Sequence, residues 1–218
     1  MKFFPVLTGF ALLLLGVTSC KTIAINSVVK KYNSETGREF PGIAAAETLN
    51  GEPFALAGPS QKVRYVHVWS TTCSPCINGM PDLNALSKKM KEYEDVEIVN
   101  ICADDAENKE RWKALVNKHN ISGENYFITD DNAFMKDFNV SNQGLPYFLI
   151  VGKDGKVLGK NLEPGDGVLT IYSLVQAREN RNVKQSIDNM MRQSKRIKKH
   201  DDDETRQFVA FLEKYAGK

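Results

Sequence analysis

Apolar residues along this chain follow two patterns, one typical of strands and one typical of helices, and segments of the two kinds alternate. Compact runs of β-branched and aromatic residues predict strands at 63–69, 96–103, 126–129 and 147–151. Apolar residues at helical spacing predict helices at 80–93, 107–119, 132–138 and 168–176. The order strand, helix, strand forms a βαβ unit, so we expect an α/β fold whose sheet has helices on both faces.

Two turns predict antiparallel strand pairs in addition to the βαβ unit. Asn50-Gly51 joins residues 44–49 to residues 54–56, and this dipeptide is among the strongest short hairpin signals. Asp154-Gly155 turns the strand at 147–151 into residues 156–159. A βαβ unit followed by a hairpin argues for a mixed sheet of parallel and antiparallel strands.

Two more helices are predicted beyond residue 176, because apolar residues keep helical spacing from 183 to 197 and again from 208 to 215. The first of them is rich in Lys and Arg, and an acidic run at 201–204 begins the second. A basic helix end beside an acidic helix start satisfies both helix dipoles. The alternative is a basic surface for anionic lipid or a protein partner.

The first twenty residues have the pattern of an export signal. Lys2 gives a positive start, residues 6–17 form an apolar core, and small residues precede Cys20. The apolar run is short for a transmembrane helix, and the small residues before Cys20 resemble a bacterial lipobox, after which this cysteine is the lipidated first residue. An ordinary secretory signal cleaved elsewhere is the alternative. Residues 20–39 are polar without periodicity, which predicts a tether.

These patterns divide the chain into a lipoprotein signal peptide at 1–19, a tether at 20–39, an α/β domain at 40–176 and a C-terminal helical extension at 177–218. The mature chain is expected in the bacterial cell envelope, lipid-anchored and facing the periplasm, where disulfides persist. The formal net charge is only +2, from 29 basic and 27 acidic residues. Nothing in these totals argues for nucleic acid or for an acidic substrate.

Cys73 and Cys76 lie between the first predicted strand of the βαβ unit and the helix that follows it. Cys73 is predicted at the helix N-terminus, where unpaired N–H groups and the positive end of the helix dipole favour a thiolate. Cys73 is therefore the predicted nucleophile. Cys76, one turn on and less exposed, is placed to attack the mixed disulfide that Cys73 forms with a substrate.

Other roles for the cysteines are weaker. A zinc site would need a second CxxC or CxxH pair, which the sequence lacks, and a structural bridge across two residues closes a loop too small to stabilise much. We therefore expect no metal and no cofactor. Cys102 has no obvious partner once Cys20 carries lipid, and a buried inert thiol is expected there, although its strand ends near the predicted site.

The stretch VWSTTCSPC, which ends at Cys76, resembles the active site of thioredoxin-fold proteins, and Pro81 follows as it does in them. The closest resemblance is to the membrane-tethered thiol-disulfide oxidoreductases of the TlpA and ResA kind. Gly144-Leu145-Pro146 resembles the cis-proline loop of that family, which guides an extended substrate segment. The resemblance covers residues 40–176. Thr72 departs from it, because the family usually has Trp immediately before the first cysteine.

This resemblance implies a thioredoxin-like fold: a central mixed β-sheet flanked by helices, with an N-terminal β-hairpin and a C-terminal helical extension. It also implies a redox-active disulfide between Cys73 and Cys76 that exchanges with thiols and disulfides of exported proteins, with Pro146 in the substrate loop. A membrane redox partner would supply electrons. Whether the protein acts as reductant, oxidant or isomerase stays open, because CxxC proteins of both directions share this spacing.

His67 occupies a position where similar thioredoxins often keep a buried acid that helps deprotonate the resolving cysteine. A histidine could accept the proton of Cys76 or, when charged, stabilise a thiolate. The alternative for His67 is a hydrogen bond to a backbone carbonyl within the strand. The alternative for the whole protein is a redox-inactive binding or assembly module of the cell envelope; a peroxidase is a weaker third hypothesis.

Overall fold

A seven-stranded mixed sheet forms the centre of the computed structural model, which describes residues 27, 29–197 and 199–216. The strands are β1 (Ile43–Thr48), β2 (Pro53–Leu56), β3 (Val63–Trp69), β4 (Val96–Asp104), β5 (Glu124–Thr129), β6 (Tyr147–Val151) and β7 (Val157–Lys160). Their order across the sheet is β2-β1-β5-β4-β3-β6-β7. β3, β4 and β5 are parallel, whereas the other neighbours pair in the antiparallel sense.

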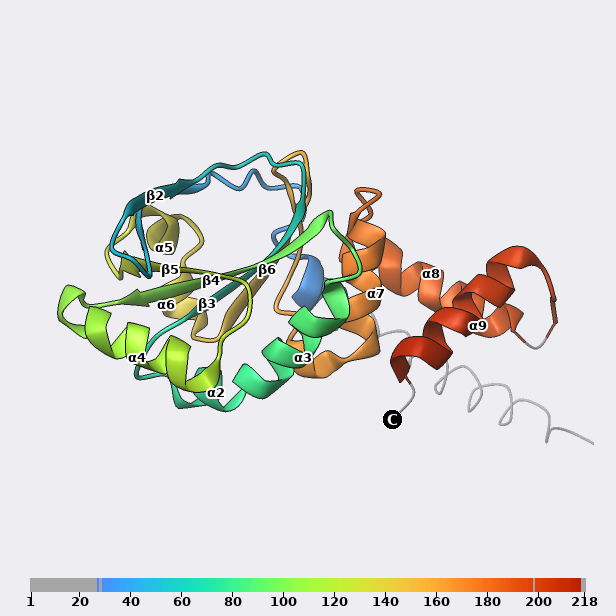
Figure 1. The fold of residues 1–218 in the computed structure, drawn as a ribbon. Helices are drawn as coiled ribbons and strands as arrows, with labels where there is room; N and C mark the ends of the chain where they lie inside the picture. The colour runs from blue at the N-terminus through green and yellow to red at the C-terminus, as the bar shows by residue number, and fades with distance from the viewer. Residues whose placement is uncertain (1–26, 28, 198, 217–218) are drawn as a thin grey trace, which may run out of the picture.

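Helices cover both faces of this sheet (Figure 1). They are α2 (Ser74–Asn78), α3 (Met80–Met90), α4 (Lys109–His119), α5 (Ala133–Asp137), α6 (Val140–Gln143), α7 (Val168–Ala177), α8 (Val183–Arg196) and α9 (Asp203–Ala216), with short 3₁₀ turns at Ala106–Asn108 and Pro164–Asp166. Apolar side chains of α3, α4 and α7 form one core cluster with the sheet. Those of α5 and α6 form a second cluster on the opposite face. The mixed sheet with helices on both faces is therefore confirmed.

β3 is buried along its whole length, because it lies between β4 and β6 and has helices over both faces. This explains why apolar residues of 63–69 occupy both faces of the strand rather than one, with Arg64 and His67 as the polar exceptions. The strand ends at Trp69, which is wholly buried and lies opposite Cys102 of β4. The chain that follows β3 thus leaves the sheet from a fixed point.

The helix predicted after Cys73 is in fact two helices. α2 ends at Gly79, whose backbone N–H bonds to the carbonyls of Pro75 and Cys76, and α3 begins at the next residue. Pro81 lies in the first turn of α3, where its missing N–H is not needed. The helical segment is therefore interrupted at Gly79, before Pro81. The short helix α6 was not predicted, because it has one apolar residue, Val140, and no period to detect.

The end of the predicted tether packs on the domain. Gly37 donates to the carbonyl of Val157 at 2.8 Å, and Val157 donates to the carbonyl of Arg38 at 2.8 Å. This pairing satisfies backbone groups on the outer edge of β7, which explains why a polar segment without periodicity is ordered there. The predicted signal peptide and Cys20 lie outside the described residues. Within the described part, no helix combines the length and hydrophobicity needed to cross a membrane.

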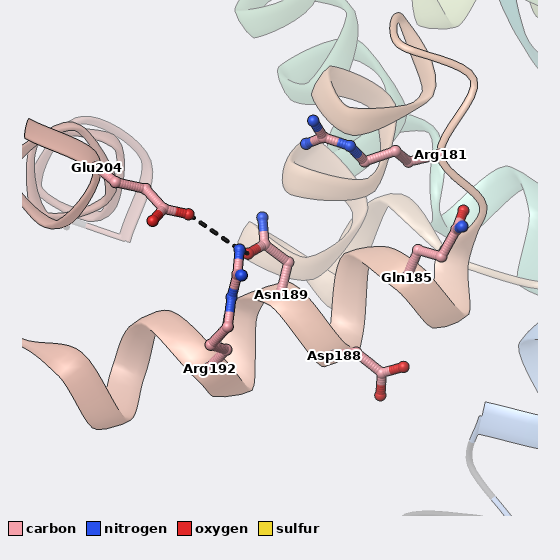
Figure 2. A pocket seen from close by; sticks show the side chains of 6 residues that line it. All are labelled: Arg181, Gln185, Asp188, Asn189, Arg192 and Glu204. Atoms are coloured by element: carbon pink, nitrogen blue, oxygen red, sulfur yellow. Dashed lines mark hydrogen bonds and ion pairs between the residues drawn. The ribbon is translucent and has the colours of Figure 1, made fainter.

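Both predicted C-terminal helices are present, and they pack on α7. Phe208 and Phe211 of α9 contact the ring of Tyr172 edge-on, with centroids 5.7 and 5.1 Å away. Arg192 of α8 donates to Glu204 of α9 at 2.9 Å (Figure 2). Arg196 of α8 also pairs with acidic residues at the start of α9. Arginines at the end of α8 thus form ion pairs with acidic residues at the start of α9, a pairing that was not predicted from the sequence.

Candidate active site

Cys73 and Cys76 form a disulfide immediately after β3, with Cα atoms 5.3 Å apart. Cys73 is the N-cap of α2, and the backbone N–H of Cys76 donates to its Sγ at 3.2 Å. Cys73 is half-buried, whereas Cys76 is only 2% exposed. The prediction that Cys76 is the less accessible sulfur is confirmed. Attack from solvent can therefore reach only Cys73.

A buried threonine holds the loop between β3 and the disulfide. The backbone nitrogen and hydroxyl of Thr71 both donate to Asp104 at the end of β4, at 2.8 and 2.7 Å. Burial alone would raise the pKa of Asp104, but hydrogen bonds from Thr71, Asn108 and the Asp105 backbone outweigh it and hold this pKa below its usual value. The carboxylate therefore stays ionised and fixes the loop that carries Cys73.

An open groove of about 590 Å³ runs beside Cys73, between the α2 loop and the α5–α6 region. Thr72 and Leu145 line it, the latter from the loop before β6. The Leu145–Pro146 bond is cis, as the resemblance implied. Thr72, the residue that departs from the family pattern, is exposed on the groove wall, and its hydroxyl lies 3.3 Å from that of Ser70.

A smaller cavity of about 70 Å³ lies on the buried side of the disulfide. His67, Cys76 and Pro146 line it, together with Asp82 and Glu163. Such a volume holds a water molecule, and the polar lining offers partners for one. The cavity thus connects the buried sulfur to the predicted histidine, whereas the groove serves the accessible sulfur.

His67 is 2% exposed in β3. Its ring stacks on Phe148 of β6 at 4.9 Å, and its Nδ1 lies 3.3 Å from Oδ1 of Asn100 in β4. Burial lowers the pKa of His67 to about 4, although the Asn100 hydrogen bond opposes this change. The imidazole is therefore neutral near pH 7. Its partner is a side chain on the next strand, not the backbone carbonyl that was the alternative expectation.

Cys102 is buried and takes no part in a disulfide. Burial is the main cause that raises the pKa of its thiol far above the usual value, and the nearby carboxylate of Asp104 adds to it. The thiol is therefore protonated at physiological pH and inert, as expected. Its strand does end beside the active-site loop, but the side chain packs in the core.

Sequence reasoning did not find Thr71, Asn100 and Asp104. A signal for two of them exists, because Asn100 and Asp104 are polar residues in the otherwise apolar stretch VNICAD. Buried polar side chains need hydrogen-bond partners, so they mark contacts with neighbouring strands. The identity of those partners depends on strand order, which the sequence pattern does not contain.

Comparisons with known proteins agree with this geometry. The Redoxin family model matches residues 35–176, which is more than half of the chain and includes the disulfide, the cis-proline loop and His67. The chain belongs to the Redoxin family. Within this family the thiol-disulfide oxidoreductase ResA of Bacillus cereus is 29% identical over 130 residues, which cover 60% of this chain and 71% of that protein.

Solved structures share the Redoxin-family fold of this chain. The thioredoxin domain of a thiol-disulfide oxidoreductase from Bacteroides vulgatus has a TM-score of 0.54 at 22% identity, over 65% of this chain and 95% of that one. A thiol:disulfide interchange protein from a Bacteroides species has a TM-score of 0.51 at 26% identity, over 60% and 84% of the two chains. This Redoxin is a TlpA/ResA-like oxidoreductase with a thioredoxin-like fold.

Proposed function

We propose that the protein exchanges disulfides with exported proteins in the bacterial cell envelope, with Cys73 as nucleophile and Cys76 as resolving cysteine. The observation that carries this proposal is the asymmetry of the Cys73–Cys76 disulfide, which has one sulfur at a groove and the other buried beside a small cavity. In the reduced protein, the Cys76 N–H that points at Cys73 Sγ favours the thiolate of Cys73.

The exchange proceeds in two steps in which electrons balance. The Cys73 thiolate attacks one sulfur of a substrate disulfide, so that a mixed disulfide forms and the other substrate sulfur leaves as a thiolate. Cys76, once deprotonated, attacks Cys73 Sγ and releases the second substrate thiolate. Two electrons pass to the substrate, and the Cys73–Cys76 disulfide forms. A thiol donor must then reduce this disulfide, and we assign that task to a membrane redox partner.

We propose that an extended segment of the substrate binds in the groove beside Cys73. The groove is open to solvent, and Gly144 and Leu145 of the cis-proline loop line it next to the nucleophile, whereas Pro146 itself lines the smaller cavity beside Cys76. A segment lying there would bring its disulfide to Cys73 rather than to Cys76. The loop that contains Pro146 would thus position the substrate through Leu145, the residue before it.

We propose that His67 is the base that accepts the thiol proton of Cys76. The two side chains line the same cavity, and the imidazole is neutral near pH 7, with its pKa lowered to about 4 by burial. Transfer of the Sγ proton to the ring, directly or through a water in the cavity, would generate the thiolate that resolves the mixed disulfide. The imidazolium then returns its proton to solvent.

The site of action is proposed from the sequence. The export signal and lipobox pattern support a lipid anchor at Cys20. This anchor would hold the domain at the membrane, on the periplasmic side. Such a location supplies both exported substrates and a membrane-bound electron source. Residues 20–39 would link the anchor to the domain.

Reduction of insulin disulfides tests the proposed function, together with the reduction potential of the Cys73/Cys76 couple. We expect insulin reduction in the presence of a dithiol, and no reduction by Cys73→Ser. Cys102→Ser is the matched control and should retain full activity, because that thiol is buried. A couple that neither reduces insulin nor re-forms its disulfide under mild oxidation would instead favour a binding module.

A further inference from the structure

Asn100 lies beside His67 in the sheet. The two residues are register partners on the parallel strands β3 and β4, and Asn100 is wholly buried. Its Oδ1 is 3.3 Å from Nδ1 of His67. The reaction proposed above does not use this side chain, and a buried amide in an apolar strand must have its polar atoms satisfied.

The orientation of the Asn100 amide is fixed by its other end. Its Nδ2 donates at 3.0 Å to the carbonyl of Ser122, in the loop before β5, and at 3.3 Å to that of Glu124, the first residue of β5. A flipped amide would place Oδ1 against these two carbonyl oxygens and lose both hydrogen bonds. Oδ1 therefore faces His67, and because a carbonyl oxygen can only accept, Nδ1 of the neutral ring must carry the hydrogen. The lone pair of the ring is then on Nε2.

Other groups around His67 do not compete for Nδ1. Phe148 stacks on one face of the ring. The other polar side chains near His67 are those that line the small cavity. The titratable groups there are Cys76, Asp82 and Glu163. His67 bonds to none of the three, and its hydrogen-bond partner among the described residues is Asn100.

We propose that Asn100 is a positioning residue: it sets the tautomer of His67, so that Nε2 is the basic nitrogen available to the cavity that Cys76 shares. This inference rests on the proposed function for its kinetic consequence. The tautomer itself can be measured independently. Without Asn100 the ring would be free to adopt the Nε2–H form, which neutral histidine prefers in water, and this form has its lone pair on Nδ1, the nitrogen that faces β4.

Nitrogen NMR of the full chain labelled at histidine measures the tautomer directly. We expect Nδ1 of His67 to have the chemical shift of a protonated ring nitrogen and Nε2 that of an unprotonated one at pH 7. In Asn100→Leu the two should exchange identities or become mixed. Asn125→Leu is the matched control, because Asn125 is also buried and binds the same loop through the carbonyls of Ile121 and Gly123. An unprotonated Nδ1 in the unmodified protein would overturn the proposal, even if the Leu variant fails to fold.

The rate at which Cys76 resolves a mixed disulfide tests whether the His67 tautomer matters for the reaction. Asn100→Leu should slow resolution of a preformed Cys73 mixed disulfide by about fivefold to tenfold, the factor that one buried hydrogen bond supplies. Asn100→Asp should instead move the acid limb of the rate–pH profile to higher pH, because a carboxylate against Nδ1–H favours the imidazolium. Equal slowing by Asn125→Leu, or an acid limb unmoved by Asn100→Asp, would overturn the positioning role. If the unmodified protein reduces no insulin while the tautomer still follows Asn100, the proposed function fails and the tautomer assignment stands.

Discussion

Asp104 accepts both the backbone N–H and the hydroxyl of Thr71, at 2.8 and 2.7 Å. Thr71 belongs to the loop that carries the nucleophile, whereas Asp104 ends the neighbouring strand. The other carboxylate oxygen accepts from Asn108 and from the Asp105 backbone, at 2.8 and 2.9 Å. The carboxylate is therefore hydrogen-bonded on both oxygens, and the position of Cys73 depends on an acid in another strand.

Replacement of Thr71 by Val should destabilise the protein by about 1.5–3 kcal/mol, because it removes a hydrogen bond to a charged group and leaves the buried acid with one donor fewer. Urea unfolding at pH 7 measures this change. Thr72→Val is the matched control, since the Thr72 hydroxyl is exposed on the groove wall. Equal stability of the two variants would contradict the structural importance of the Thr71–Asp104 contact.

Because of the Thr71–Asp104 contact, we expect the stability of the fold to decrease at acidic pH. The pKa of Asp104 is below its usual value in the folded protein despite burial, so its stabilisation is present above the pKa of the unfolded chain and is lost as pH falls through the folded value. Thr71→Val should raise the pKa of Asp104 and move the acid-unfolding midpoint to higher pH. Circular dichroism against pH measures the midpoint, and a midpoint that does not move would count against this reasoning.

Protonation of His67 should also destabilise the fold in acid, at higher pH than protonation of Asp104. Its pKa is about 4 in the folded protein, lowered from 6.5 by burial, so the unfolded chain binds a proton that the folded chain does not. Stability should therefore fall as pH drops from 6.5 to 4, by about 3 kcal/mol in total. His67→Phe should remove most of this slope in urea unfolding measured from pH 7 to 4. Parallel slopes for the two proteins would show that His67 titrates normally.

Cys76→Ser should trap covalent complexes with substrates, because the nucleophile remains while the attack that resolves its mixed disulfide is lost. Non-reducing gels of cells expressing this variant should show new high-mass bands that disappear with reductant. Cys73→Ser should give none. If Cys73→Ser produced the bands and Cys76→Ser did not, the assigned roles of the two cysteines would be reversed.

Cys20→Ala should release the protein from the membrane without unfolding it, because a lipid anchor needs this sulfur and the described domain packs without it. Fractionation of cells and a urea unfolding curve of the released protein measure the two effects. Cys102→Ala should remain with the membrane. Quantitative retention of Cys20→Ala in the membrane pellet would exclude an anchor at that residue.

The sequence alone was sufficient for the local architecture around the disulfide. The β-branched and aromatic residues at 63–69, the CxxC motif and the helical period after it predict a strand, a loop and a helix, and the structure has the strand, the loop and a helical segment divided into α2 and α3. The Asn50-Gly51 turn likewise predicts the β1–β2 hairpin that is present. Such features depend on residues close in the chain, so that spacing and turn chemistry determine them. The family motifs add the cis-proline loop by resemblance.

Only the tertiary structure decided which distant residues meet. The contact of His67 with Asn100 joins β3 to β4, and that of Thr71 with Asp104 joins the loop after β3 to β4; α2 and α3 separate these segments in the chain. Periodicity tells which face of a strand a residue occupies, but not which strand lies beside it or in which register. Strand order and register come from the packing of the whole sheet and its two helical layers. The hydrogen bonds that hold Cys73 and orient His67 exist only once that packing is complete.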